Sequence, residues 1–150
     1  MYSRVFAGML GILLAMMFMG IALADKENAS TTDSIASPQI AITAANFVAP
    51  SPEKEHLNEE WVEITNLGTS DINLAGWTLS DAQNHTYTFP GFSLAAGAKV
   101  FVRTGKGDND IENLFWNRSN SIWNNNGDLA VLKDPEGNTI SMYPEEGKEA

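Results

Sequence analysis

The sequence has 150 residues, of which 43% are hydrophobic and 9% aromatic, so it can form one globular domain with a single core. Its formal net charge of -10 repels phosphate groups and anionic lipids, and nucleic acid is therefore not expected as a main partner. It contains no cysteine, which excludes disulfide bonds, thiolate metal sites and a cysteine nucleophile.

The N-terminal segment, residues 1–24, has the pattern of a secretory signal peptide. Arg4 supplies one positive charge, residues 5–23 are apolar and uncharged, and the segment ends in Ala22-Leu23-Ala24. Small residues at these positions favour cleavage after Ala24. If the segment is not cleaved it anchors the chain in a membrane instead, because about 20 apolar residues span a bilayer. We therefore expect a secreted or cell-surface protein.

Three regions follow the signal peptide. Residues 25–38 are small and polar and bury too little apolar surface to offset the entropy of ordering, so we expect a flexible linker. Residues 39–144 hold the predicted domain, and residues 145–150 form a short acidic tail.

The run from residue 60 to residue 81 predicts two strands at the centre of the domain. Val62 and Ile64 share one face of the first strand, and after a polar turn Ile72 and Leu74 repeat the alternation. Strands with one apolar face need a second sheet to cover that face. This run therefore predicts a two-layered architecture.

Two segments beside these strands break the strand pattern. Ala75-Gly76 breaks the alternation, which predicts a bend or bulge, and Trp77 directly after it is expected to be buried in the core. Upstream, residues 53–60 are mostly charged and are interpreted as a solvated loop.

Further short strands are predicted on both sides of the central run, and residues 104–122 are predicted to be a long connection. Roughly seven to nine strands at a spacing of about ten residues, with no amphipathic helical period after the signal peptide, indicate an all-β sandwich. The other predicted strands are residues 39–47, 85–89, 100–102, 129–132 and 139–143.

The domain carries a series of short motifs: EWVEITN at 60–66, LAGWTL at 74–79, YTFP at 87–90, FSLAAG at 92–97, the strand at 100–104, the turn at 123–128 and the hairpin at 129–137. In their order and spacing these motifs resemble the lamin tail domain. The resemblance covers about residues 40–143 and implies an immunoglobulin-like β-sandwich. With its export signal and without a coiled-coil rod, the sequence is similar to the prokaryotic, secreted members, in which the domain often accompanies hydrolases and nucleases.

Catalytic residues are not predicted. The two histidines, His56 and His85, do not lie in a recognisable nucleophile motif. Glu60 and Glu63 are an odd number of positions apart, so on a strand they point to opposite faces and cannot act as a carboxylate pair. We expect neither an enzyme nor a bound cofactor.

A calcium site is the most serious alternative among the metals. Asp108, Asp110 and Glu112 place carboxylates at alternate positions of a polar loop, which suits the oxygen preference of Ca²⁺. The EF-hand pattern fails, because Asn113 stands at the glycine position and Ser119 at the position of the closing glutamate. A solvated acidic loop without metal is therefore expected.

Asparagines in glycosylation triplets and exposed tryptophans are two further features that could relate this protein to glycans. Acceptor triplets for N-glycosylation occur at Asn28, Asn84 and Asn117. Exposed tryptophans can stack on sugars, but of the four tryptophans Trp61 alone has the parity opposite to the apolar face of its strand. Trp77, Trp116 and Trp123 are expected in the core.

These observations favour a non-catalytic interaction module that binds protein or glycan partners through its loops and sheet edges, and that is a monomer. The first alternative is an accessory or catalytic part of a secreted hydrolase or nuclease system. The second is a calcium-dependent adhesion module.

Overall fold

The computed structural model describes residues 39–144 of the chain. The predicted signal peptide, linker and acidic tail lie outside the described residues, and so does Asn28. Among the described residues no helix is long and apolar enough to cross a membrane.

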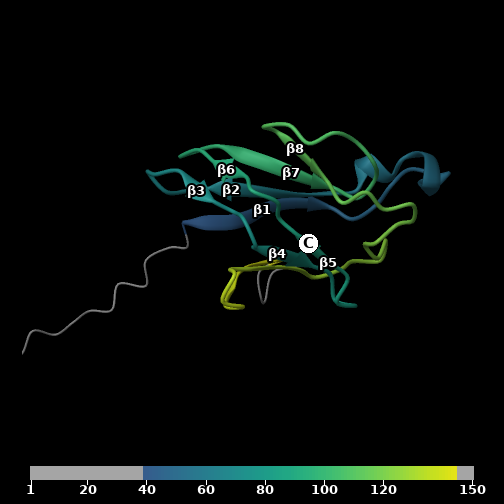
Figure 1. Ribbon diagram of the computed structural model, residues 1–150. Helices are drawn as coiled ribbons and strands as arrows, with labels where there is room; N and C mark the ends of the chain where they lie inside the picture. The colour runs from purple at the N-terminus through teal and green to yellow at the C-terminus, as the bar shows by residue number, and fades with distance from the viewer. Residues whose placement is uncertain (1–38, 145–150) are drawn as a thin grey trace, which may run out of the picture. The chain divides into compact units, whose positions relative to one another are not determined.

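One layer of the domain is a sheet in which the strand order is β1-β2-β7-β8 (Figure 1). β1 and β2 are antiparallel, as are β2 and β7, whereas β7 and β8 are parallel. The strands are β1 (Ile40–Asn46), β2 (Trp61–Asn66), β7 (Lys99–Arg103) and β8 (Asn113–Phe115).

The second layer faces the first and has the order β10-β9-β4-β5, with all neighbours antiparallel. A small two-stranded sheet, β3-β6, joins the first layer at one end in Figure 1. These strands are β3 (Ile72–Asn73), β4 (Thr78–Ser80), β5 (Thr86–Thr88), β6 (Ser93–Leu94), β9 (Ala130–Lys133) and β10 (Thr139–Tyr143). Two single turns of 3-10 helix, η1 (Glu53–Glu55) and η2 (Leu57–Glu59), precede β2.

The core lies between the two layers and is built from the alternation seen in the sequence. Val62 and Ile64 of β2 are fully buried, as predicted, and they belong to one cluster with Leu79 of β4 and Leu132 of β9. Each of these strands turns its other face outward, so hydrophobic burial fixes the register of the sheets. The predicted all-β sandwich is confirmed, although the described residues form ten strands where seven to nine were expected.

The interruption at Ala75-Gly76 is a change of sheet. The chain leaves β3, makes a tight turn in which the Trp77 amide donates to the Leu74 carbonyl at 3.0 Å, and enters β4 in the opposite layer. Gly76 has φ +79°, a conformation that favours glycine. Trp77 directly precedes β4 and is only partly buried, so it does not lie inside the core as predicted. The residue packs against the border of the core, while Leu74 and Leu79 lie inside it.

Strand β8 was missed, because residues 104–122 were expected to form a connection without a strand. β8 is only three residues long, and Leu114 is its one buried side chain. A strand this short shows no alternation of its own. In addition, β8 pairs with β7 in parallel. Parallel strands are joined by a crossover and not by a hairpin, so the sequence shows no hairpin turn between them.

Candidate functional site

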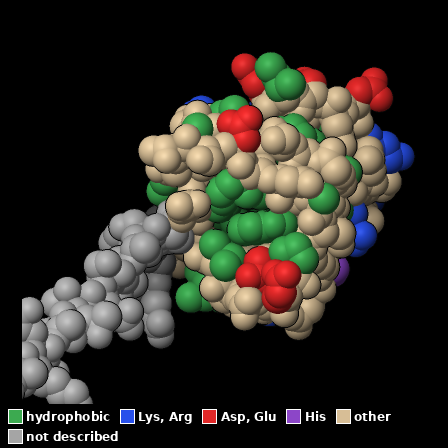
Figure 2. Space-filling view, turned by 60° about the vertical axis from the view of Figure 1, so that its left-hand side comes forward, with side chains coloured by type: hydrophobic (Ala, Val, Ile, Leu, Met, Phe, Trp, Pro, Cys, Tyr) green, Lys and Arg blue, Asp and Glu red, His purple; other side chains and the backbone are tan. Residues whose placement is uncertain are grey.

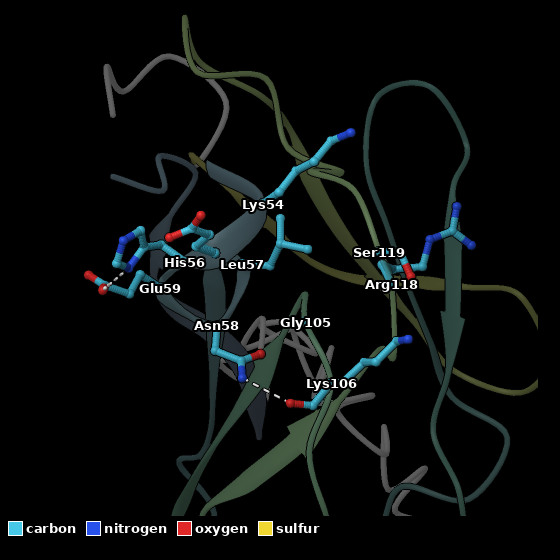
Figure 3. Close-up of a pocket in the computed structure, with 10 residues that line it drawn as sticks. Lys54, His56, Leu57, Asn58, Glu59, Gly105, Lys106, Arg118 and Ser119 are labelled. Carbon is cyan, nitrogen blue, oxygen red and sulfur yellow. Dashed lines mark hydrogen bonds and ion pairs between the residues drawn. The ribbon is translucent and has the colours of Figure 1, made fainter. Parts of the chain in front are cut away.

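A hollow of about 390 Å³ lies beside η2, between η1 and the segments that follow β7 and β8 (Figure 3). Three regions far apart in the sequence meet there: residues 54–59, 105–106 and 118–119. Figure 3 shows the side chain of Lys106 extending toward the segment that carries Arg118 and Ser119, whereas the side chain of Arg118 extends away from both lysines. The hollow is lined by Lys54, Glu55, His56, Leu57, Asn58, Glu59, Gly105, Lys106, Arg118 and Ser119.

Hydrogen bonds between the three regions fix the walls of the hollow. Nη1 of Arg103 donates to the backbone oxygen of Asn58 at 2.8 Å, and Nδ2 of Asn58 donates to the backbone oxygen of Lys106 at 2.9 Å. The amide of Arg118 donates to the carbonyl of Thr104 at 3.0 Å. A Cβ at Gly105 would lie 2.3 Å from Oδ1 of Asn58, so the two segments can approach this closely only because residue 105 is glycine.

Glu60 anchors this end of the sandwich from inside. Its side chain is 0% exposed, and the two carboxylate oxygens accept hydrogen bonds from the Ser121 hydroxyl and, at 3.4 Å, from the Ile122 amide. The interpretation of residues 53–60 as a solvated loop is therefore wrong for Glu60. The sequence held a signal for its burial, because Glu60 has the same parity as Val62 and Ile64 and so points inward.

The hollow concentrates positive charge in an acidic protein. Among residues 39–144 the ion pairs are His56–Glu59 at 3.4 Å, His85–Asp81 at 2.6 Å and Lys99–Glu63 at 2.8 Å. Lys54, Lys106 and Arg118 belong to none of these pairs, and all three are exposed. They are half of the lysines and arginines in the described part of the chain, which are Lys54, Lys99, Arg103, Lys106, Arg118 and Lys133.

Sequence reasoning did not find this group of cations. Each of the three side chains lies in a different polar segment, at positions 54, 106 and 118, and none of these segments carries a motif. Lys99, Arg103 and Lys106 are the densest basic group in the sequence, but of these Lys106 alone lines the hollow. Arg103 instead donates to the backbone oxygen of Asn58 and, through Nε at 2.6 Å, to Oδ1 of Asn113. The group exists only because the fold brings the three loops together.

A second hollow of about 370 Å³ shares Arg118 and Ser119 with the first and contains His85. Nδ1 of His85 lies 2.6 Å from Oδ2 of the buried Asp81, an arrangement that holds an imidazole in one orientation. The other oxygen of Asp81 accepts the His85 amide at 2.7 Å, which also closes the turn before β5. Ser121 lines the same hollow, but its hydroxyl donates to Glu60. The two histidines lie in different hollows.

In the acidic loop of residues 108–112, which was considered as a calcium site, the Asp110 side chain accepts hydrogen bonds from nearby backbone amides. Oδ1 of Asp110 accepts the amides of Glu112 at 2.8 Å and of Asn113 at 2.7 Å. These backbone hydrogen bonds hold the pKa of Asp110 below its usual value. Within the described residues, three or more histidine or acidic side chains nowhere gather in a way that could hold a metal ion, and this includes Asp108 and Glu112.

The outer face of the first sheet carries aromatic and charged side chains. Trp61 points outward, as its parity predicted, and its ring meets that of Phe101 edge to face at 5.2 Å between centroids. Glu63 is on the same face and Glu60 on the opposite one, as expected. Burial raises the pKa of Glu63, but hydrogen bonds from Lys99 and Thr43 outweigh this effect and leave the pKa below its usual value.

Apolar surface is also exposed near this sheet. A groove of about 510 Å³ runs along Phe101 and Ile111 toward β6, and Ile111 is 82% exposed. Figure 2 shows the end of the domain that lies on the left in Figure 1, where hydrophobic side chains gather between acidic ones. The described acceptor asparagines for glycosylation, Asn84 and Asn117, are both exposed. Trp116 and Trp123 are buried in the core, as predicted.

A family model of the Lamin Tail Domain matches residues 33–146 of the chain. The match includes all described residues, and therefore the whole β-sandwich and both polar hollows. A comparison with curated proteins gave no match.

Proposed function

Because the chain belongs to the Lamin Tail Domain family, we propose that it is a non-catalytic interaction module of an exported protein, which binds a protein or glycan partner through its loops. The observation that carries this proposal is the hollow beside η2, whose lining includes Lys54, Lys106 and Arg118, three cations that form no ion pairs among the described residues. Loops held on a rigid sandwich are common binding sites, because the scaffold positions them without ordering costs at the moment of binding.

The charge of the protein makes this hollow distinct from the rest of the surface. With a net charge of -10 the chain repels anions in general, whereas three cations at one hollow create a local attraction. A partner that presents one or two anionic groups to the loops gains from this local field. A partner that is anionic over a wide area is repelled by the surrounding carboxylates.

The interaction test uses the full-length chain, produced with export and immobilised, against the secreted and envelope fractions of its host and against a glycan array. A partner retained by the wild type is expected to be lost when Lys106→Ala and Arg118→Ala are combined. Lys133→Ala, a change of the same charge on β9 in the other sheet, is the matched control and should retain the partner. If the double variant and the control bind equally, the loops are not the interaction surface.

A hydrolase is the alternative function, and the Asp81–His85 pair is the observation that favours it. The pair supplies an oriented imidazole, but the hydroxyl of Ser121, which lines the same hollow, donates its hydrogen bond to Glu60. We therefore propose that the pair closes the turn before β5. Nuclease, phosphatase and glycosidase assays of the full-length chain should give no turnover, and turnover abolished by His85→Ala would replace the interaction module by an enzyme.

A further inference from the structure

We propose that the hollow beside η2 binds an acidic sugar, that is, a sugar residue of a glycan that carries a carboxylate or sulfate group. This inference rests on the proposed function and specifies the chemistry of the partner. Four features of the hollow carry it: the unpaired cations, the hydrogen-bond acceptors among them, the absence of an aromatic platform, and the size.

The cations require an anionic ligand. Lys54, Lys106 and Arg118 line one space together with Glu55 and Glu59, and none of the three cations forms an ion pair with a described acidic side chain. A carboxylate or sulfate placed between them makes charge-assisted hydrogen bonds, which are about twice as strong as bonds between neutral groups.

The acceptors in the wall require a ligand that also donates hydrogen bonds. Oδ1 of Asn58 is buried and accepts no hydrogen bond from residues 39–144, and the carboxylate of Glu55 lines the same hollow. An inorganic phosphate or a nucleic-acid backbone offers mainly acceptors, so it meets these oxygens unfavourably. A sugar ring carries hydroxyl groups that can donate to the carboxylate of Glu55, which lines the hollow.

The remaining features restrict the ligand further. Apart from His56, which is paired with Glu59, the lining contains no aromatic ring on which a nucleobase or a neutral sugar could stack. Charge and hydrogen bonds must therefore provide the recognition. A volume of about 390 Å³ is near the lower end of the range of roughly 300–1,000 Å³ for small-molecule sites, which fits a ring-sized group at the end or along the chain of a glycan.

The experiment is calorimetric titration of the full-length chain with four probes at low salt and at about 0.15 M salt, where the screening length is roughly 8 Å. The probes are an oligogalacturonide, its neutral methyl ester, a sulfated heparin-type oligosaccharide and inorganic phosphate. We expect at least one acidic oligosaccharide to bind about tenfold or more tightly than the methyl ester, because the ester lacks the charge-assisted bonds. The oligogalacturonide and the sulfated probe distinguish a carboxylate from a sulfate as the preferred group.

Variants test whether the oligosaccharide binds at this hollow, and they distinguish the acidic-sugar inference from the more general proposal of an interaction module. Lys106→Ala and Arg118→Ala should each weaken the acidic oligosaccharide about tenfold, and Lys133→Ala should leave it unchanged. Equal binding of the acid and its ester, or no binding of either acidic probe, overturns the inference. If phosphate or a protein partner is bound instead and the same two variants abolish that binding, the interaction module stands and the acidic sugar is wrong.

Discussion

Glu60 and Tyr87 illustrate how single residues at the boundary of the core set the properties of this domain. Both are buried, and both carry a polar group into the interior. The carboxylate of Glu60 accepts hydrogen bonds from Ser121 and Ile122, whereas the hydroxyl of Tyr87 has no partner among the described residues. Their substitutions should therefore have opposite effects on stability.

Replacing Glu60 by alanine should lower the free energy of unfolding by about 2 to 4 kcal/mol, because it leaves the buried Ile122 amide and the half-buried Ser121 hydroxyl without an acceptor. Denaturant unfolding of the wild type and the variant measures this difference. Glu59→Ala is the control. The Glu59 side chain is next in sequence to Glu60 but exposed, so its removal should change the free energy of unfolding by no more than about 0.5 kcal/mol. If Glu60→Ala is as stable as Glu59→Ala, the carboxylate does not hold the loop from residue 117 to residue 123 in place.

Tyr87 should make the domain sensitive to high pH. Burial raises the pKa of Tyr87 from the usual 10.0 to about 12. The unfolded chain loses this proton near pH 10 while the folded chain keeps it, so stability is full below pH 10 and falls as the pH rises toward 12. The loss attributable to this group amounts to roughly 2 to 3 kcal/mol, at 1.36 kcal/mol for each pKa unit.

Tyr87→Phe removes both the titration and the unpartnered hydroxyl. At pH 7 the variant should be as stable as the wild type or more stable, because no hydrogen bond is broken. Between pH 10 and pH 12 the difference in unfolding free energy between the two proteins should grow in favour of the variant. Unfolding curves that stay parallel over this range would show that the hydroxyl titrates normally in the folded state.

At the level of elements, β8 shows how an edge strand is protected. Its outward amides are bound by side chains of the loop just before it: the Asn113 amide by Oδ1 of Asp110 at 2.7 Å, and the Phe115 amide by Oδ1 of Asn109 at 2.9 Å. Free amides on an edge strand pair readily with a second chain. The polar composition of this loop, which suggested calcium, thus has a structural use.

Asp110→Ala should expose the edge of β8. We expect faster hydrogen exchange at the Asn113 amide and more self-association at high protein concentration, measured by exchange and by analytical ultracentrifugation. In the wild type the same change should appear on acidification, because the pKa of Asp110 is lowered in the folded state and its contribution is lost as the pH falls through that pKa. Asp108→Ala is the control, and equal behaviour of the two variants would contradict the capping role.

At the scale of the whole molecule, charge decides which partners are possible. The described domain gathers three cations at one hollow and is otherwise rich in carboxylates. Affinity for a duplex depends on releasing counterions from many phosphates, which requires a wide basic surface. Arg103, the centre of the densest basic group in the sequence, is occupied by Asn58 and Asn113.

The full-length chain should therefore not bind duplex DNA at about 0.15 M salt, a condition under which short-range contacts persist and long-range attraction is screened. Fluorescence anisotropy with a labelled duplex is the measurement. Saturation at low micromolar protein, weakened by added salt and by Arg118→Ala, would refute this expectation. Such binding would mean that the hollow beside η2 is part of a larger surface that contacts nucleic acid.

The sequence by itself determined the parts of this protein that depend on neighbouring residues. Alternation predicted that Val62 and Ile64 point inward and Trp61 outward, and the turn around Gly137 predicted the β9–β10 hairpin. Both predictions were possible because the two-residue period and the turn chemistry are local properties of the chain. The order of these motifs was also enough to indicate the family. The burial of Glu60 followed the same period, and it was missed because charge was given more weight than parity.

Only the tertiary structure decided the position of Trp77, the parallel pairing of β8 and the hollow beside η2. Each depends on how separate segments pack together: the change of layer at Gly76, the parallel neighbour that β7 provides for β8, and the close approach of Asn58 to Gly105. Such contacts form when many residues bury their apolar faces together, so they leave no pattern within one segment. The three cations at positions 54, 106 and 118 become a site for the same reason, since packing of the two sheets brings their loops to one end of the sandwich.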